Sequence, residues 1–474
     1  MPEFDVVVIG AGAAGLSAAA LSAALGLKVA LIERGAMGGD CLNYGCVPSK
    51  ALLAAGHAAA AARRAGRLGI RVSEPEVDWA AVQAHVKGAI ARIAPNDSVA
   101  RFRAMGVEVI QARAHFASPT MVEAAGRRLS FRRCVIAAGS AAVVPDIPGL
   151  GPVPWLTNET IFDLEDKPEH LVILGGGPIG LEMAQAHARL GVQVTVLEAG
   201  SIAGREDPEL AEGLRRTLLA EGVTLHEGVE VTRFTTAGGG LIAWLADGRT
   251  IGGSHLLLAT GRAPRLAGLD LQAGQVAFTA RGVTTNAALR STTNPRVYAV
   301  GDIADPLGIG PRAFTHVCSH HAGILARAML FRLPAKVDYA ALPRVTYTEP
   351  ECAQIGLTEA EARAAGHEVR LLRFPLGETD RAIAEGIEEG LVKLVVRPDG
   401  RLLGAGILAP HAGEMAGLFA LMISKQIKLS ALAGLMLPYP TLAEAAKRAA
   451  SDFYTPKFLS APVKRLVGLL KRLP

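Results

Sequence analysis

Cys41 and Cys46 are the side chains of this sequence best suited to redox chemistry. They lie five residues apart in the segment GDCLNYGCVPSK, residues 39–50, which ends on Lys50. In a chain with no visible secretory signal, paired thiols are more often catalytic or metal-binding than structural. A Gly-rich loop precedes them by about one supersecondary unit. This context favours a redox-active pair of cysteines.

A Gly-rich loop followed by a distant acid occurs twice in the chain. The first loop, GAGAAG, follows an apolar strand predicted at 4–9, and an acid follows the next predicted strand at 28–32. The second loop, GGGPIG, repeats this plan with strands predicted at 171–174 and 193–197. In both copies the first Gly and the acid are 23 residues apart, as in a βαβ dinucleotide-binding unit. The residues concerned are Gly10, Gly12, Gly15 and Glu33, and Gly175, Gly177, Gly180 and Glu198.

Each of these residues has a physical role in such a unit. The first Gly permits a tight turn, the second lets the backbone approach a pyrophosphate, and the third lets helix and strand pack closely. The helix N-terminus supplies free N–H groups, and the acid accepts hydrogen bonds from ribose hydroxyls. Two units therefore predict two dinucleotides. Glu198 would repel a 2′-phosphate, which favours NADH, while the nearby Arg205 leaves NADPH open.

Together these motifs resemble the class I pyridine nucleotide-disulfide oxidoreductases, which include lipoamide dehydrogenase, glutathione reductase and mercuric reductase. The resemblance implies that the first loop binds FAD and the second binds the nicotinamide cofactor. It also implies that Cys46 is the flavin-proximal thiol and Cys41 the interchange thiol that meets substrate. Both are expected at the start of a helix, where the dipole lowers a thiol pKa. Lys50 falls where the family has a Lys near flavin N5, and Glu182 where a Glu pairs with that Lys.

Three further segments extend the resemblance. VYAVGDIAD, with Gly301 and Asp302, resembles the second FAD motif of the family, in which the Asp binds the ribityl chain. CVIAAGS, with Gly139, and LLLATGRAP, with Gly261, resemble the strand-end crossovers between domains. Their expected role is structural.

The resemblance and the order of elements predict an α/β fold with two Rossmann-type dinucleotide-binding domains and a C-terminal α+β dimerisation domain. The FAD domain is expected at 1–149 and 270–336, with the NAD(P) domain inserted at 150–269. A Pro-rich stretch at 145–154 reads as the first linker. The dimerisation domain is expected at 337–460 and a basic tail at 461–474. The family resemblance implies a homodimer.

The sequence departs from the dithiol enzymes of the family near its C-terminus. In those enzymes the C-terminal motif resembles HPTxxE, whose His acts as the acid-base group. This chain reads PYPTLAEA instead, with Tyr439 at the His position and Glu444 retained. A phenol with a pKa near 10 does not shuttle protons at neutral pH as an imidazole does. The Pro-Tyr pair is similar to mercuric reductase, but no Cys follows Cys352, so the vicinal pair of that enzyme is absent from this sequence.

These features predict an NAD(P)H oxidoreductase that delivers electrons to a thiol-bound metal, as in mercuric reductase, or to a small-molecule disulfide. One alternative is a dihydrolipoamide dehydrogenase variant. Another, of a different class, is a nucleotide-sensing or membrane-docking flavoprotein with vestigial catalysis, and a quinone or oxygen reductase is a further option.

The other cysteines carry weaker indications. Cys134 lies in a predicted strand and is expected in the core, and Cys352 is expected to be inert. Cys318 has three histidines nearby, which makes a metal site conceivable. Its segment, THVCSHHAG, instead resembles the family's helix beneath the flavin, so no dedicated metal site is predicted. The histidines are His316, His320 and His321.

The net charge of +5 is concentrated at the C-terminus. The last eighteen residues hold five basic residues and no acid, so the remainder is balanced and a nucleic-acid partner is not expected. Treated as a helix, 463–473 places its apolar residues on one face and its basic residues opposite. Docking on the enzyme's own dimer and peripheral contact with an anionic membrane both suit such a helix. The N-terminus shows no secretory signal, and a cytoplasmic location is expected.

Overall fold

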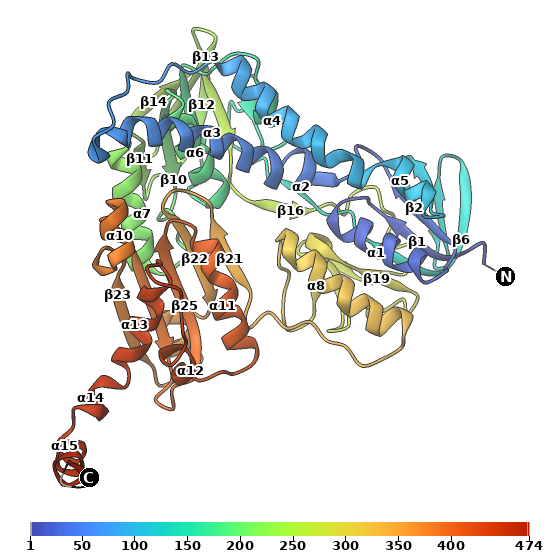
Figure 1. Cartoon of the computed structure of the whole chain (residues 1–474). Helices are drawn as coiled ribbons and strands as arrows, with labels where there is room; N and C mark the ends of the chain where they lie inside the picture. The colour runs from blue at the N-terminus through green and yellow to red at the C-terminus, as the bar shows by residue number, and fades with distance from the viewer. Residues whose placement is uncertain (1, 472, 474) are drawn as a thin grey trace.

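The computed structural model describes residues 2–471 and 473. Figure 1 shows three regions: the N-terminal strands with α8, the sheet around β9 and β10, and the C-terminal sheet around β22 and β25. The tail leaves the third region as a separate projection (Figure 1). The predicted α/β class is confirmed.

The first region is built on a mostly parallel sheet with the order β3-β2-β1-β6. β1 (Phe4–Ile9) lies between β2 and β6, and its continuous apolar run is buried because both of its faces are covered. The last residues of β6 also pair with β19, while its first residues pair with β5. The other strands of this sheet are β2 (Val29–Glu33), β3 (Glu108–Gln111), β4 (Ala114–Ser118), β5 (Met121–Ala124), β6 (Arg127–Ile136) and β19 (Val297–Ala299). A separate three-stranded sheet contains β17 (Phe278–Thr279), β18 (Gly282–Thr285) and β20 (Ala304–Pro306).

Helices cover this sheet and carry the chain toward the second region. α1 packs beside α8, and the long α3 packs against both α4 and α6. Gly56 permits the approach to α6, because a Cβ there would lie 3.3 Å from the Ala186 carbonyl oxygen. The helices are α1 (Ala13–Ala24), α2 (Gly39–Asn43), α3 (Cys46–Arg64), α4 (Trp79–Ile93), α5 (Val99–Ala104) and α8 (Thr315–Leu325).

The second region repeats the nucleotide-binding plan. Its parallel sheet has the order β11-β10-β9-β15-β8, with an antiparallel sheet β12-β13-β14 beside it. A two-stranded crossover, β7 with β16, joins it to the first region. Its elements are β7 (Ser140–Ala142), β8 (Trp155–Leu156), β9 (His170–Leu174), α6 (Pro178–Arg189), β10 (Gln193–Glu198), α7 (Pro208–Ala220), β11 (Thr224–Glu227), β12 (Val231–Ala237), β13 (Gly240–Leu245), β14 (Thr250–Gly253), β15 (His255–Leu258) and β16 (Arg262–Pro264).

The third region is an antiparallel sheet, ordered β21-β22-β25-β24-β23, with helices packed on it. Its elements are β21 (Pro343–Thr346), β22 (Glu351–Gly356), α9 (Glu359–Ala364), β23 (Arg370–Pro375), α10 (Asp380–Glu385), β24 (Leu391–Val396), β25 (Leu402–Ala409), α11 (Ala412–Ser424), α12 (Leu429–Ala433) and α13 (Glu444–Asp452). The boundaries expected near 149, 269 and 336 stay predictions.

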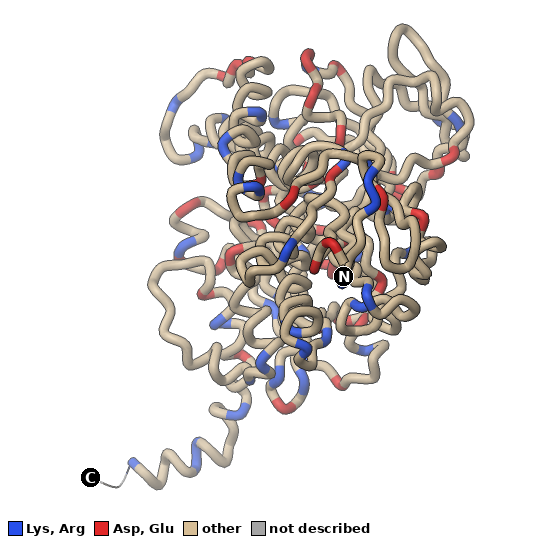
Figure 2. The backbone as a smooth tube through the Cα atoms, turned by 90° about the vertical axis from the view of Figure 1, so that its right-hand side faces the viewer, with Lys and Arg blue, Asp and Glu red and all other residues tan. Residues whose placement is uncertain are grey.

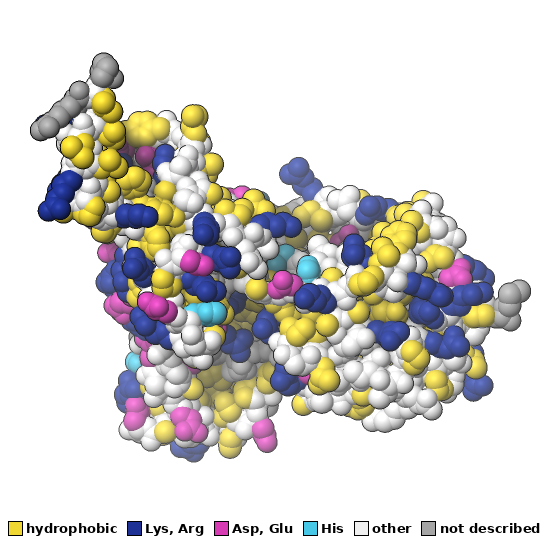
Figure 3. Space-filling view, turned by 90° about the horizontal axis from the view of Figure 1, so that it is seen from below, with side chains coloured by type: hydrophobic (Ala, Val, Ile, Leu, Met, Phe, Trp, Pro, Cys, Tyr) yellow, Lys and Arg dark blue, Asp and Glu magenta, His cyan; other side chains and the backbone are white. Residues whose placement is uncertain are grey.

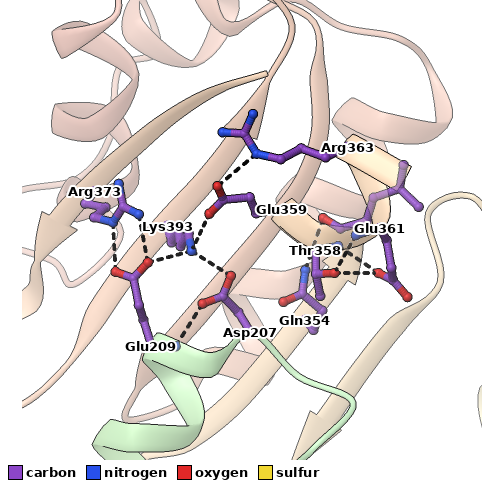
Figure 4. A network of polar contacts seen from close by, with 10 residues as sticks. Asp207, Glu209, Gln354, Thr358, Glu359, Glu361, Arg363, Arg373 and Lys393 are labelled. Carbon is purple, nitrogen blue, oxygen red and sulfur yellow. Dashed lines mark hydrogen bonds and ion pairs between the residues drawn. The ribbon is translucent and has the colours of Figure 1, made fainter. Parts of the chain in front are cut away.

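A buried lysine joins the second region to the third (Figure 4). Lys393, on β24, is 3 % exposed, and its Nζ lies 2.8 Å from Asp207 Oδ2 and 2.6 Å from Glu209 Oε1. Asp207 is also the N-cap of α7, where it accepts a hydrogen bond from the Glu209 N–H. Glu359, from α9, adds a third carboxylate at 3.3 Å. The ammonium therefore neutralises acids that belong to two regions.

The tail consists of α14 (Thr455–Phe458) and α15 (Ala461–Leu470), and neither helix has a buried residue. The predicted helix thus ends at Leu470 rather than at 473, and Arg472, part of its predicted basic face, lies outside the described residues. Across residues 2–471 and 473, no helix combines the length and apolar character that a membrane crossing requires.

Candidate active site

The two Gly-rich loops have the same geometry. Gly10 and Gly175 have φ of +103° and +115°, in the left-handed region that favours glycine. A Cβ on Gly15 would lie 1.8 Å from the Gly10 carbonyl oxygen, and one on Gly180 would lie 2.0 Å from that of Gly175. These four glycines are required for the turn and for packing of the following helix.

The middle glycines face open space instead. A Cβ on Gly177 would meet nothing within 4 Å, and one on Gly12 would meet only the Gly39 Cα, at 3.8 Å. Both lie at the N-cap of a helix, where backbone N–H groups are free to bind an anion. The exposed backbone of each loop therefore fits a pyrophosphate.

The two acids are held by backbone amides in matching positions. Glu33 accepts hydrogen bonds from the Ala11 N–H at 2.6 Å and the Gly35 N–H at 2.8 Å. Glu198 accepts them from the Gly176 N–H at 2.6 Å and the Gly200 N–H at 2.8 Å. Each carboxylate is thus fixed at the end of a strand beside its loop. The two sites fit two dinucleotides, with FAD and NAD(P)H as the expected pair.

The second predicted FAD motif lies at the crossover. Ser140 Oγ donates to Asp302 Oδ2 at 2.5 Å, and Arg262 Nε donates to Ser140 Oγ at 2.9 Å. Burial raises the pKa of Asp302. Gly139 and Gly261, beside the two crossover strands, have φ of +68° and +132°. The structure therefore brings three segments distant in sequence to one place.

His321, on α8, contacts the Gly301–Asp302 motif, and the sequence did not indicate this contact. It is 1 % exposed, and its Nδ1 accepts a hydrogen bond from the Gly301 N–H at 3.0 Å. Its Nε2 lies 2.6 Å from the Tyr339 hydroxyl. Burial, with a smaller contribution from His320, lowers the pKa of His321 to about 4. Among the described residues no group of three His, Cys, Asp or Glu side chains is arranged to hold a metal ion.

The cysteine segment abuts the first Gly-rich loop. Gly38 and Gly39 have φ of +91° and +59°, and a Cβ on Gly39 would lie 2.6 Å from the Gly12 Cα. The expectation that both cysteines lie at one helix start needs correction, since Cys41 is inside the short α2 and Cys46 opens α3. The helices are separate because the chain turns at Gly45, which has φ −132° and ψ −107°.

The two thiols are electrostatically unequal. Cys46 is the more accessible of the two, and its Sγ lies 3.2 Å from Thr315 Oγ1, on α8. A hydrogen bond from Cys41, supported by Thr315 and the charge of Lys50, lowers the pKa of Cys46 to about 6 against the opposing effect of desolvation. The same thiol–thiol hydrogen bond raises the pKa of Cys41. One proton shared by the pair thus leaves the charge on Cys46.

Lys50 and Glu182 meet as predicted, although they are 132 residues apart. Lys50 Nζ lies 2.7 Å from Glu182 Oε2, and the Glu182 side chain is only 7 % exposed. Glu182 Oε1 also accepts a hydrogen bond from the Tyr347 N–H at 2.9 Å. The Lys50 ammonium lies 4.3 Å from the Tyr347 ring centroid. Tyr347 therefore contacts both members of this pair, and no sequence motif indicated it.

Asp40 ties the cysteine segment to the crossover, and this too was missed from sequence. Its Oδ1 accepts from Asn158 Nδ2 at 3.0 Å, and its Oδ2 lies 3.2 Å from Arg262 Nη2. The residue directly before Cys41 is therefore anchored by the second region and by the crossover strand β16.

Tyr439 lies apart from the cysteines within one chain. It is 68 % exposed on the loop between α12 and α13, helices that Figure 1 places well away from α2. Its hydroxyl donates to Asp380 Oδ2 at 2.5 Å, and this hydrogen bond raises the pKa of the phenol. Glu444 opens α13, and its Oε2 is buried with no hydrogen-bond partner in the described part of the chain.

Two family models together match nearly the whole chain. The model described as "Pyridine nucleotide-disulphide oxidoreductase" matches residues 4–323. The chain belongs to this family. The family's dimerisation domain matches residues 342–450. Members are FAD-dependent and use NAD(P)H, so the two loops of this oxidoreductase belong to a known two-cofactor arrangement.

Named relatives of this oxidoreductase have more than one activity. A mercuric reductase of Streptomyces lividans is 37 % identical over 462 residues, covering 95 % of this chain and 96 % of the relative. A dihydrolipoyl dehydrogenase of Geobacillus stearothermophilus is 32 % identical and covers 94 % and 96 %. A solved Cu(II) complex of the HOCl-induced flavoprotein disulfide reductase RclA from Escherichia coli is 25 % identical, with a TM-score of 0.84, and covers 94 % and 99 %.

Proposed function

We propose that the chain is a homodimeric NAD(P)H oxidoreductase that passes two electrons through Cys41 and Cys46 to a thiol-bound metal ion, with a small-molecule disulfide as the second class of acceptor. The observation that carries this proposal is the unequal thiol pair beside the first Gly-rich loop. The lowered pKa of Cys46 and its accessible position are properties of a reactive cysteine rather than a structural one.

FAD, bound along the first loop, would supply the two-electron chemistry that links NAD(P)H to the disulfide. Reduction of the Cys41–Cys46 bond takes two electrons and one proton to give a Cys41 thiol and a Cys46 thiolate. Thr315 and Lys50 stabilise that thiolate, and Glu182 orients Lys50. As the Cys41 sulfur bonds to the acceptor, its proton passes to a departing thiolate, and the pair returns to the disulfide as the acceptor takes up the two electrons.

A metal thiolate is favoured over lipoamide by the C-terminal motif. Dithiol exchange needs a group that gains and loses a proton near neutral pH. Tyr439 stands where the dithiol enzymes have that His, and Asp380 raises its pKa further. A reduction of Hg(SR)2 by NAD(P)H and one proton releases Hg(0), NAD(P)+ and two RSH, and it needs no such base. The similarity to the mercuric reductase of Streptomyces lividans and to RclA, which was solved as a Cu(II) complex, supports this choice.

NADH is the proposed nicotinamide substrate. The Glu198 carboxylate is fixed by two amides at the end of β10, where it suits free ribose hydroxyls and repels a 2′-phosphate. Arg205 is exposed nearby. We expect kcat/KM for NADH to exceed that for NADPH by at least about tenfold, or about 1.4 kcal/mol. An equal or reversed ratio would assign the site to NADPH.

An acceptor panel tests the proposed function. The FAD-loaded dimer should oxidise NADH with Hg(II) bis-thiolates faster than with lipoamide, glutathione disulfide or quinones. Cys41→Ser should abolish metal-dependent turnover while FAD content stays unchanged. Turnover with a quinone that survives Cys41→Ser would identify a quinone reductase, and lipoamide turnover equal to the best acceptor would identify a dihydrolipoamide dehydrogenase variant. A bound flavin that NADH does not reduce would indicate a sensing or docking flavoprotein.

A further inference from the structure

The C-terminal tail presents an apolar surface that the described chain leaves uncovered. α15 has no buried residue, and Figures 1 and 2 show the tail pointing away from the body. Large apolar side chains on it are strongly exposed, and Figure 3 shows hydrophobic and basic side chains together along the projection. The exposed fractions are Phe458 68 %, Leu459 61 %, Leu466 54 %, Val467 56 %, Leu469 63 % and Leu470 51 %.

The positions of these side chains make the helix amphipathic. At 100° per residue, Leu466, Leu469 and Leu470 fall on one side of α15. Lys464 and Arg465 lie on the other side and are exposed. A helix that is apolar on one side and basic on the other can lie in the plane of a bilayer interface, with its cations at the level of the lipid headgroups.

The distribution of charge favours an anionic surface as the occupant. The sequence has 49 basic and 44 acidic residues, and five of the basic residues follow position 456 with no acid after Asp452. The rest of the chain therefore has 49 − 5 = 44 basic and 44 acidic residues and is formally neutral. A second copy of this neutral body offers no net charge to complement the tail, whereas an anionic bilayer does.

We propose that α14 and α15 form a peripheral membrane anchor that binds the surface of an anionic lipid bilayer. The apolar side of α15 enters the interface, and Lys457, Lys464, Arg465 and Lys471 contact the headgroups. In a homodimer two such anchors act together, which raises the affinity above that of one short helix. The anchor places the reductase at the membrane surface.

Co-sedimentation of the FAD-loaded full chain with vesicles tests this inference. Binding to phosphatidylcholine vesicles with about 30 % phosphatidylglycerol should exceed binding to pure phosphatidylcholine by at least about tenfold, and it should weaken in high salt. Truncation after Phe458 should remove binding and leave NADH oxidation unchanged. The triple variant Leu466→Ser, Leu469→Ser and Leu470→Ser should lose binding as well.

A matched control uses three exposed leucines of the body. Leu25, Leu68 and Leu219 are 46 %, 65 % and 50 % exposed, and changing all three to Ser should leave vesicle binding unaltered. No binding to either vesicle, or equal binding to both, would overturn the inference. So would a truncated chain whose dimer dissociates in sedimentation velocity while the full chain binds no vesicles, because the tail would then dock on the partner subunit. These results do not depend on the electron acceptor.

Discussion

Cys46 owes its reactivity to neighbours from three elements. Cys41 comes from α2, Thr315 from α8 and Lys50 from the first turns of α3. An accessible thiol with a pKa of about 6 is largely a thiolate at neutral pH. The shared proton keeps Cys41 protonated until an acceptor approaches, so the two sulfurs have different tasks although they are chemically identical.

Alkylation of the reduced, FAD-free chain tests this inequality, because bound FAD would cover the flavin-proximal Cys46. The iodoacetamide rate should rise with pH through a midpoint near 6, and mass spectrometry should locate the label on Cys46. Thr315→Val removes one hydrogen bond to the sulfur and should move the midpoint upward by about one pH unit. The remote Thr217→Val, on α7, is the control. A midpoint near 9 in the unmodified enzyme would contradict the assignment.

His321 is a positioning residue for the Gly301–Asp302 motif. His321→Phe leaves the Gly301 N–H without its acceptor, which costs about 1–3 kcal/mol, so FAD should dissociate at least about fivefold more readily. His321→Asn, whose side-chain oxygen can replace Nδ1, should restore most of the affinity. Fluorescence of released FAD measures both variants, and equal affinity in all three proteins would refute this role.

The titration of His321 also predicts a pH dependence. Its pKa is lowered from 6.5 to about 4 in the folded chain, so the unfolded chain binds more protons between these values. The contribution of the neutral His321 to the stability of the folded chain is fully present above pH 6.5, and it is lost as the pH falls toward 4. The difference in unfolding free energy between the native chain and His321→Phe should therefore shrink over this range. Urea titrations at pH 7.5 and 4.5 would detect it, and a constant difference would exclude it.

At the scale of elements, Lys393 couples α7 to the sheet of the third region. Lys393→Met leaves Asp207, Glu209 and Glu359 close together without their shared cation (Figure 4). We expect a loss of about 3 kcal/mol in the free energy of unfolding. Arg249→Met, which breaks the solvent-exposed pair with Asp247, should have a much smaller effect on the free energy of unfolding. Equal effects in urea unfolding would show that burial of the lysine adds nothing.

At the scale of the whole molecule, Tyr439 can take part in the reaction only in a site that two subunits share, with the cysteines supplied by the other subunit. It is exposed on the third region and lies apart from the cysteines of its own chain. Glu444 opens the helix that follows this loop, and its Oε2 is buried with no hydrogen-bond partner in the described part of the chain. The family's dimerisation domain covers both residues.

Subunit mixing tests a site shared across the dimer. Cys46→Ser and Tyr439→Ala homodimers should each be strongly impaired with a Hg(II) bis-thiolate. After mixing and reassociation, about half the dimers are mixed and each has one intact site, so about one quarter of wild-type turnover should return. Mixing each variant with itself is the control. No recovery despite exchange of subunits would place Tyr439 outside the shared site.

Patterns local in sequence were enough to predict the nucleotide-binding units. A strand buried on both faces needs a continuous apolar run, and a turn that approaches a phosphate needs glycine, so 4–9, Gly10 and Gly175 are recognisable without a structure. The resemblance to a family also placed Lys50 opposite Glu182. The separation of the cysteines into two helices was not foreseen, because it depends on the backbone turn at Gly45.

The amino-acid sequence was sufficient for the fold class, the two Gly-rich loops and the thiol pair, because each depends on residue types at short or repeated spacings. The folded chain was needed for the environment of the thiols. Thr315 is 269 residues from Cys46, and His321 is 20 from Gly301, and no periodicity links such positions. Their contacts arise when sheet and helix packing bring α8 beside both Cys46 and Gly301, and the contact with Thr315 helps to set which sulfur is charged.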